Sequence, residues 1–242
     1  MWDRDAVIEV HTRFNEASKS CAESLLRSFK GTGGNTIGNE GCLISCLAMV
    51  LAHLCEETWN PSLLNAEAIK RLYYSRCGLA MATLYSDLIS EVSAGEVQLC
   101  LKEEYLSGEQ GWSKVLAHES LPLRAYRSLP RKDRKYFIAM LKTGTYDDTV
   151  ASHYVIADPL AQADVDDPDV PLLDPAMPMD WTGGIWTLSR SAQRITEDKQ
   201  IRKEWDRQGI DPLQIAGVWL FARWQSKNQR SLIMPLAEVL AR

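Results

Sequence analysis

The chain has 242 residues, enough for one large domain or two small ones, and a formal net charge of −5 with acidic and basic residues interspersed. Because no basic block stands out, the sequence argues against nucleic acid as the main partner. No apolar run is long enough to span a membrane, and no signal-peptide core follows the charged N-terminus. We therefore expect a protein that is cytoplasmic at synthesis, and the sequence leaves export or injection without a cleaved signal open.

The six cysteines do not indicate a disulfide scaffold in a chain of this length. Four potential metal ligands lie close together in the sequence, namely Cys42, Cys46, His53 and Cys55. They lack the Cys-x-x-Cys spacing of a zinc knuckle and would all lie on one continuous helix. The acidic residues between 164 and 169 lack the central glycine and final glutamate of an EF-hand loop. We therefore expect no metal site and no cofactor.

The first part of the chain predicts a buried helix that begins with a cysteine. Apolar spacing predicts an amphipathic helix over residues 5–30, and glycines predict a loop over residues 30–41. Residues 42–55 are too apolar for an exposed helix and too short for a membrane span, so they predict a buried central helix. Cys42 would open this helix, where the helix dipole and the unpaired amides of the first turn favour a thiolate. This is a plausible platform for a nucleophile.

Two further helices and a strand are expected next. The pair Asn60–Pro61 is typical of an N-cap followed by a first helical position, and this helix is expected to reach about Arg76. A third helix is expected over residues 82–92. Alternating apolar and polar residues predict a half-buried strand over residues 97–102.

Strand patterns dominate the second half of the chain. After residues 109–118, which we expect to be helical, runs at 135–141 and 153–157 flank a polar turn and predict a hairpin. Residues 171–173 and 215–224 predict further strands. Because helices come first and strands later, the sequence predicts an α+β fold with segregated layers.

A cysteine nucleophile needs a base, most often a histidine, and a third group that orients the histidine. Of the four histidines, His153 opens a strand directly after a polar loop, where a side chain can face a cleft. His53 lies more than two turns past Cys42 on the same rigid helix and cannot reach back to it. Asp174 closes the next strand-like run and is the better orienting carboxylate. Asp158 lies five positions past His153, so strand alternation would put it on the opposite face.

Four motifs occur in a fixed order along residues 30–180. They are Gly38-x-x-Gly41-Cys42-Leu-x-x-Cys46-Leu-Ala-Met-Val-Leu51, then Pro61-x-x-Leu64-Asn65, then Ser152-His153-Tyr-Val-Ile, then Leu173-Asp174-Pro175-Ala. Together they resemble bacterial papain-like cysteine peptidases, specifically the branch of bacteriocin leader-processing domains and their phage and secreted relatives. The resemblance implies a papain-like fold, with N-terminal helices and a central nucleophile helix packed on a C-terminal antiparallel sheet. It also implies Cys42 as nucleophile, His153 as general base and acid, and Asp174 as the orienting residue.

One position departs from that family. Its members usually carry a glutamine six residues before the cysteine, where the side-chain amide stabilises the oxyanion, and this chain has Thr36 there. Asn35 or Asn39 could supply an amide instead, beside the backbone N–H of Cys42. Losing one oxyanion donor typically costs about 100- to 1000-fold in rate.

These observations lead to one leading hypothesis and one alternative. We expect a single papain-like domain over residues 1–242, with an N-terminal helical extension over residues 1–29 and a C-terminal strand and helix extension over residues 185–242. The leading hypothesis is a cysteine peptidase or amidase that hydrolyses a peptide or amide substrate through a thioester, with a bacterial effector or toxin as its setting by analogy. The alternative is an inactive papain-like scaffold that binds a peptide, a protein partner or an inhibitor, and Thr36 favours it.

Overall fold

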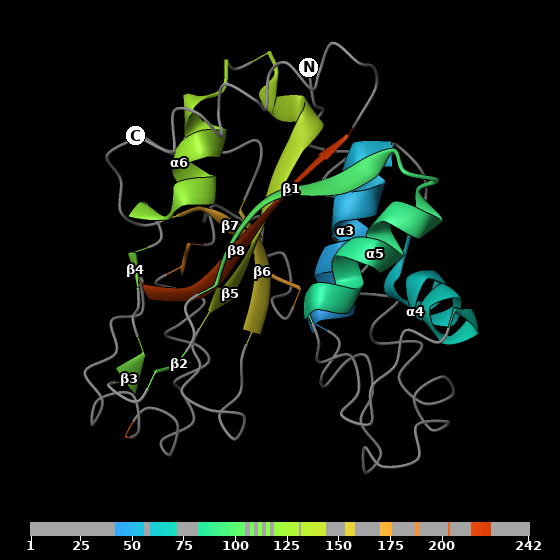
Figure 1. The fold of residues 1–242 in the computed structure, drawn as a ribbon, viewed down its shortest axis with the longest axis horizontal. Coiled ribbons are helices and arrows are strands. Elements are labelled where there is room, and N and C mark those ends of the chain that lie inside the picture. Colours follow the sequence, from blue (N-terminus) through green and yellow to red (C-terminus); the bar gives the residue numbers. More distant parts are fainter. Residues whose placement is uncertain are drawn as a thin grey trace, which may run out of the picture.

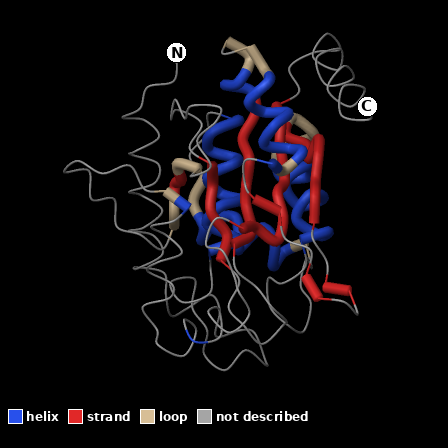
Figure 2. The backbone as a smooth tube through the Cα atoms, turned by 90° about the vertical axis from the view of Figure 1, so that its left-hand side faces the viewer, coloured by secondary structure: helices blue, strands red, loops and turns tan. Residues whose placement is uncertain are grey.

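The structure is a computed structural model that describes the following part of the chain: residues 42–55, 59–71, 82–104, 107–108, 111–112, 115–116, 119–130, 132–143, 153–157, 170–175, 187–188, 203 and 214–223. The helix expected over 5–30 and the loop expected over 30–41 lie outside it. The described residues form an α+β fold in which helices cover both faces of an antiparallel sheet (Figure 1). Figure 2 shows the strands side by side, with helices in front of the sheet and behind it.

The sheet has six antiparallel strands, and its two longest inner strands come from distant parts of the sequence. In spatial order its main path is β1 (Val97–Glu104), β8 (Gln214–Arg223), β5 (Phe137–Thr143), β6 (His153–Ala157) and β7 (Leu172–Leu173). The short strand β4 (Val115–Leu116) also pairs with β8, and β2 (Ser107–Gly108) pairs with β3 (Gly111–Trp112) in a separate ribbon. Since β8 lies between β1 and β5, the core of the fold includes this C-terminal strand.

Four α-helices of the described part pack on the two faces of this sheet. They are α3 (Cys42–Cys55), α4 (Pro61–Lys70), α5 (Ala82–Val92) and α6 (Leu121–Ser128), and a short 3-10 helix, η3 (Arg134–Tyr136), precedes β5. Helix α3 packs against the sheet and is flanked by α4 and α5, whereas α6 covers the other face (Figure 1). The first turn of α6 is held from β1, because the Leu121 backbone N–H donates to Glu103 Oε2 at 2.7 Å.

Strand alternation divides the core into two clusters. The sheet residues that face α3 include Val97, Ile138, Met140, Tyr154, Ile156, Leu173, Trp219 and Phe221. Those that face α6 include Phe137, Ala139, Leu141, Val155, Ala157, Leu172, Val218 and Leu220. Because both faces of the sheet are apolar and covered, the sequences of its strands are nearly continuous apolar runs and lack the alternation typical of half-exposed strands.

Most of the predicted elements are confirmed. Helices occur over 42–55 and 82–92, and β5 and β6 form the predicted antiparallel hairpin. Helix α4 begins at Pro61 as expected, since Asn60 Oδ1 accepts a hydrogen bond from the Leu63 N–H at 2.8 Å, but it ends at Lys70, before the predicted end at Arg76.

Two elements differ from the sequence-based expectation. The helix expected over 109–118 is wrong, because this stretch contains β3 and β4, and β4 is held by pairing with Ile215 of β8. Helix α6 was not expected at all. Its strong local signal is Pro122 at the helix start, and the rest of its stability comes from packing on strands that are distant in sequence.

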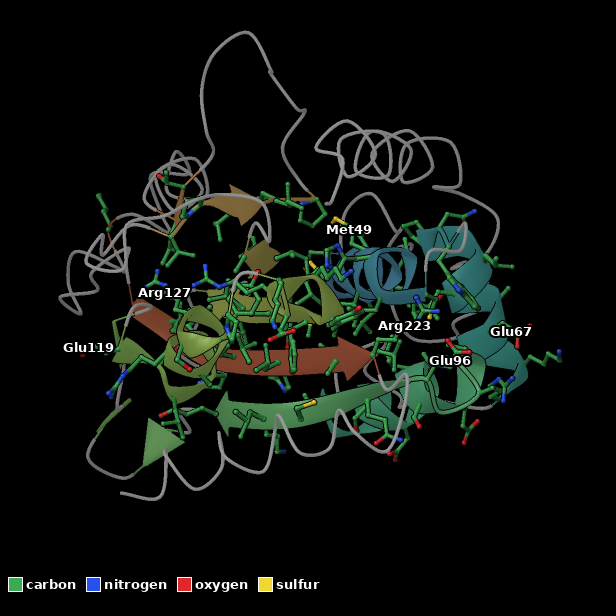
Figure 3. All side chains as sticks on the ribbon, turned by 90° about the horizontal axis from the view of Figure 1, so that it is seen from above. Met49, Glu67, Glu96, Glu119, Arg127 and Arg223 are labelled. Carbon is green, nitrogen blue, oxygen red and sulfur yellow. The ribbon has the colours of Figure 1, made fainter. Side chains whose placement is uncertain are left out.

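Ion pairs tie the periphery of the α3 side together. Arg71 contacts Glu91 at 3.0 Å and Glu67 at 3.3 Å, which links the end of α4 to α5. Arg223 lies 3.6 Å from Glu96, at the point where β8 ends beside the start of β1 (Figure 3). Exposed pairs of this kind contribute little to stability, about 0–1 kcal/mol each, so the apolar clusters hold the fold.

A substitution at Gly217 tests how closely the Trp219 ring lies on the sheet. A Cβ atom at position 217 would lie 2.8 Å from Cη2 of Trp219 and 3.3 Å from the carbonyl oxygen of Glu103. Since neither a buried ring nor the backbone yields easily, we expect Gly217→Ala to lower the free energy of unfolding by about 1–3 kcal/mol in urea titrations. In a Trp219→Phe background, which lacks Cη2, the same substitution should cost less. Equal costs in both backgrounds would contradict the close contact.

Candidate functional site

Only the two ends of helix α3 are accessible from outside the protein. Every residue from Leu43 to Leu54 is buried, whereas Cys42 and Cys55 are partly exposed. The sequence explains this, because the helix is apolar on all sides and must be surrounded. A partly exposed thiol therefore stands at the first position of a helix that is otherwise enclosed.

The C-terminal end of α3 is fixed on β5, and this gives the helix its direction. The buried ring of His53 makes a polar contact with the backbone at Phe137, where β5 begins. Back along the helix, Cys42 lies about 16 Å from His53, at 1.5 Å per residue. Along β5, Lys142 lies about 16 Å from Phe137, at 3.3 Å per residue. Since α3 runs alongside the strands (Figure 1), Cys42 lies near the level of Lys142, where β5 ends and β6 begins.

Asp174 lies at the same end of the interface. Asp174 directly follows β7 and is 1% exposed. Leu173 pairs with Ile156, so the antiparallel chain after Leu173 continues toward the start of β6. Burial raises the pKa of the Cys46 thiol well above its usual range, and the nearby charges of Cys42 and Asp174 raise it further. Because Cys46 is one turn past Cys42, the carboxylate lies near the first turn of α3.

His153 also belongs to this end of the sheet. It is the first residue of β6, and its backbone pairs with Thr143, the last residue of β5. Strand β6 packs directly on α3. The structure therefore brings Cys42, Asp174 and the backbone of His153 to one end of the interface between α3 and the sheet. The imidazole of His153 lies outside the described side chains.

Several predicted site residues lie outside the described part of the chain. These are Asn35, Thr36 and Asn39, the candidates for the oxyanion position, and Asp158, the less favoured of the two candidate orienting carboxylates. Cys46 is fully buried in the core cluster, as expected for a structural thiol. Within the ranges that the structure describes, no three His, Cys, Asp or Glu side chains cluster as metal ligands would. In the same ranges, no helix is both long enough and apolar enough to cross a membrane.

The sequence reasoning missed a lysine at this end of the sheet. Lys142 is on β5, two positions past Met140, and so falls on the face toward α3. Its ammonium lies 5.9 Å from the centre of the Tyr154 ring, which is part of the α3 cluster. The signal was the alternation itself, since Ile138, Met140 and Lys142 share one face and the last of them is charged.

No protein-family model, curated protein or solved structure matches the chain. The site is therefore interpreted from its own geometry and chemistry.

The buried His53 makes stability depend on pH. Burial lowers the pKa of His53 to about 3, and the contact with the backbone of Phe137 opposes part of this shift. Between pH 6.5 and 3, the unfolded chain binds a proton at this residue that the folded chain does not. The free energy of unfolding therefore falls as the pH falls, by about 1.4 kcal/mol per pH unit from this residue.

Urea unfolding of the wild type and of His53→Gln at pH 7 and pH 5 measures this contribution. We expect the wild type to lose about 2 kcal/mol more than the variant between these pH values, because glutamine does not titrate. If both proteins lose the same amount, His53 does not remain neutral in the folded state.

Proposed function

We propose that this chain is a papain-like cysteine hydrolase that cleaves an amide bond, with Cys42 as nucleophile, His153 as general base and acid, and Asp174 as the orienting carboxylate. One observation carries the proposal: the thiol at the open end of an enclosed helix lies at the same end of the sheet as a buried carboxylate and the first residue of β6. The α+β layering, with α3 packed on an antiparallel sheet, supports the same proposal.

The first half of the reaction is acylation. The Cys42 thiolate attacks the carbonyl carbon of the substrate, a C–S bond forms, and the carbonyl oxygen becomes an oxyanion. The backbone N–H groups at the start of α3 have no partner within the helix, so they are suited to stabilise that oxyanion. His153 donates its proton to the leaving amine as the C–N bond breaks, which leaves a thioester on Cys42.

The second half is hydrolysis of the thioester. His153 removes a proton from water as the water oxygen attacks the thioester carbon, and the C–S bond then breaks to return the thiolate. Asp174 holds the imidazole in one orientation and stabilises its positive charge. The buried Cys46 takes no part, because its raised pKa keeps it a neutral thiol near pH 7.

The first test is alkylation of Cys42 by iodoacetamide at pH 6, mapped residue by residue by mass spectrometry. An ordinary thiol is only about 0.3% ionised at this pH, whereas a thiolate paired with imidazolium stays ionised. We expect Cys42 to react fastest of the six cysteines, and His153→Ala to slow that reaction about 100-fold. His53→Gln is the matched control and should leave the rate unchanged. Inert Cys42, or an equal rate in His153→Ala, would sink the proposal.

A second test separates the two candidate orienting carboxylates. Asp174→Asn keeps the size of the side chain but removes its charge, so the imidazolium loses its stabilising partner. We expect alkylation of Cys42 at pH 6 to fall about 10-fold in this variant and its rate–pH profile to lose reactivity on the acidic side. Asp158→Asn should behave like the wild type. The reverse result would assign the role to Asp158.

Thr36 keeps the binding-module alternative open, because it stands where the related peptidases carry an oxyanion-stabilising glutamine. An activated ester such as p-nitrophenyl acetate distinguishes the two functions. A hydrolase acylates Cys42 and then releases acetate, so intact mass shows a transient adduct whose decay requires His153. A binding module either fails to form the adduct or retains it.

A further inference from the structure

Lys142 is held at the edge of an aromatic wall on the α3 side of the sheet. Its backbone pairs with Tyr154 on one side and Gly217 on the other. The rings of Tyr154 and Trp219 lie with their centres 5.7 Å apart, and these residues are 7% and 2% exposed. Trp219 also extends over Gly217, since its ring fills the space above that backbone. The two rings therefore form a buried aromatic pair beside the lysine.

The ammonium of Lys142 marks the end of this wall. It lies 5.9 Å from the centre of the Tyr154 ring, and the residue is partly exposed. A lysine in this setting packs its aliphatic stem on apolar surface and keeps its charge at the boundary with water. An attraction between the cation and the ring face holds the charge there. The position of the ammonium is thus fixed by packing rather than left to a free side chain.

The ammonium of Lys142 lies near the level of Cys42, because the distance from His53 to Cys42 along α3 matches the distance from Phe137 to Lys142 along β5. Among the described residues, other charged positions on the same face include the buried Asp174 near Cys46 and, on the outer strand β1, Lys102, which pairs with Trp219, and Glu104, which pairs with Gly217. Asp174 is enclosed, whereas Lys142 reaches the boundary with water. A molecule that reaches the open end of α3 at the level of Lys142 therefore meets a positive charge.

We infer that Lys142 selects substrates that carry a carboxylate close to the amide bond that Cys42 attacks. This inference rests on the proposed hydrolase function. The ammonium would pair with the carboxylate of such a substrate, and the buried Tyr154 ring beside it would keep the lysine in place. Acidic side chains and a free C-terminal carboxylate supply the same chemistry. Substrates with a positive charge at this place are disfavoured by like-charge repulsion.

The charge can be tested without knowing the substrate, by comparing two alkylating agents on the intact chain. Iodoacetate is anionic and iodoacetamide is neutral, and both alkylate a thiolate by the same displacement of iodide. The ratio of their rates at Cys42 therefore reports the local charge that an incoming anion meets. We expect Lys142→Gln to lower the iodoacetate-to-iodoacetamide ratio about 3- to 10-fold at low salt, and Lys142→Arg to restore it. Salt near 1 M should remove most of the difference.

Lys132→Gln is the matched control. Lys132 is an exposed lysine before η3, near the opposite end of β5, and its loss removes the same net charge from the chain. Its ratio should equal that of the wild type. Equal slowing of both reagents in Lys142→Gln, or an unchanged ratio, overturns the role of Lys142 while Cys42 still passes the pH 6 test. If Cys42 fails the pH 6 test in the wild type, the hydrolase proposal itself falls, so the two failures are distinguishable.

Once a turnover assay exists, peptides that differ in one residue extend the test. We expect the preference for an acidic over a neutral residue beside the cleaved bond, measured as the ratio of kcat/KM values, to fall about 10-fold in Lys142→Gln. Lys142→Glu should reverse the preference toward basic residues. A preference that is the same in all three proteins would overturn the assignment.

Discussion

The burial of helix α3 is the constraint on which the rest of the structure depends. Twelve consecutive residues, Leu43 to Leu54, are buried, so the helix needs apolar neighbours on every side. The sheet supplies one side, and α4 and α5 lie against others. A helix enclosed in this way can present reactive groups only at its ends. The N-terminal end, where unpaired amides and the helix dipole favour negative charge, is the end that carries the thiol.

Polar groups lie near both ends of α3 where it packs on the sheet. Apolar packing alone gives a helix such as α3 no preferred direction, because either orientation buries about the same apolar area. His53 meets the backbone at the start of β5, and Asp174 lies near the first turn of the helix. Reversing the helix would move the buried imidazole away from the backbone at Phe137, which is unfavourable because a buried polar group would lose that contact. Of these two groups, only Asp174 also has a role in the proposed reaction.

Local sequence patterns correctly predicted the elements that local interactions determine. The periodicity of α3 and α5, the N-cap at Asn60, and the alternation in β5 and β6 are all visible in the sequence, and the structure follows them. Predictions from the sequence failed where contacts between distant segments decide the structure. Strand β4 forms because it pairs with β8, and α6 forms because it packs on the second face of the sheet. The roles of Cys42 and Asp174 were predicted from a resemblance to peptidases, not from spacing, and they stay predictions. Lys142 was missed because its neighbours Tyr154 and Trp219 come from other strands.

The charges at the open end of α3 constrain one another. A carboxylate that is 1% exposed is costly unless positive charge or hydrogen-bond donors compensate it. Cys46 adds no charge here, because burial raises the pKa of its thiol well above its usual range. Two of the basic residues that the topology brings to this end are His153 and Lys142. His153 can gain and lose its proton near neutral pH, whereas a lysine remains charged, so the first suits proton transfer and the second suits recognition of an anion.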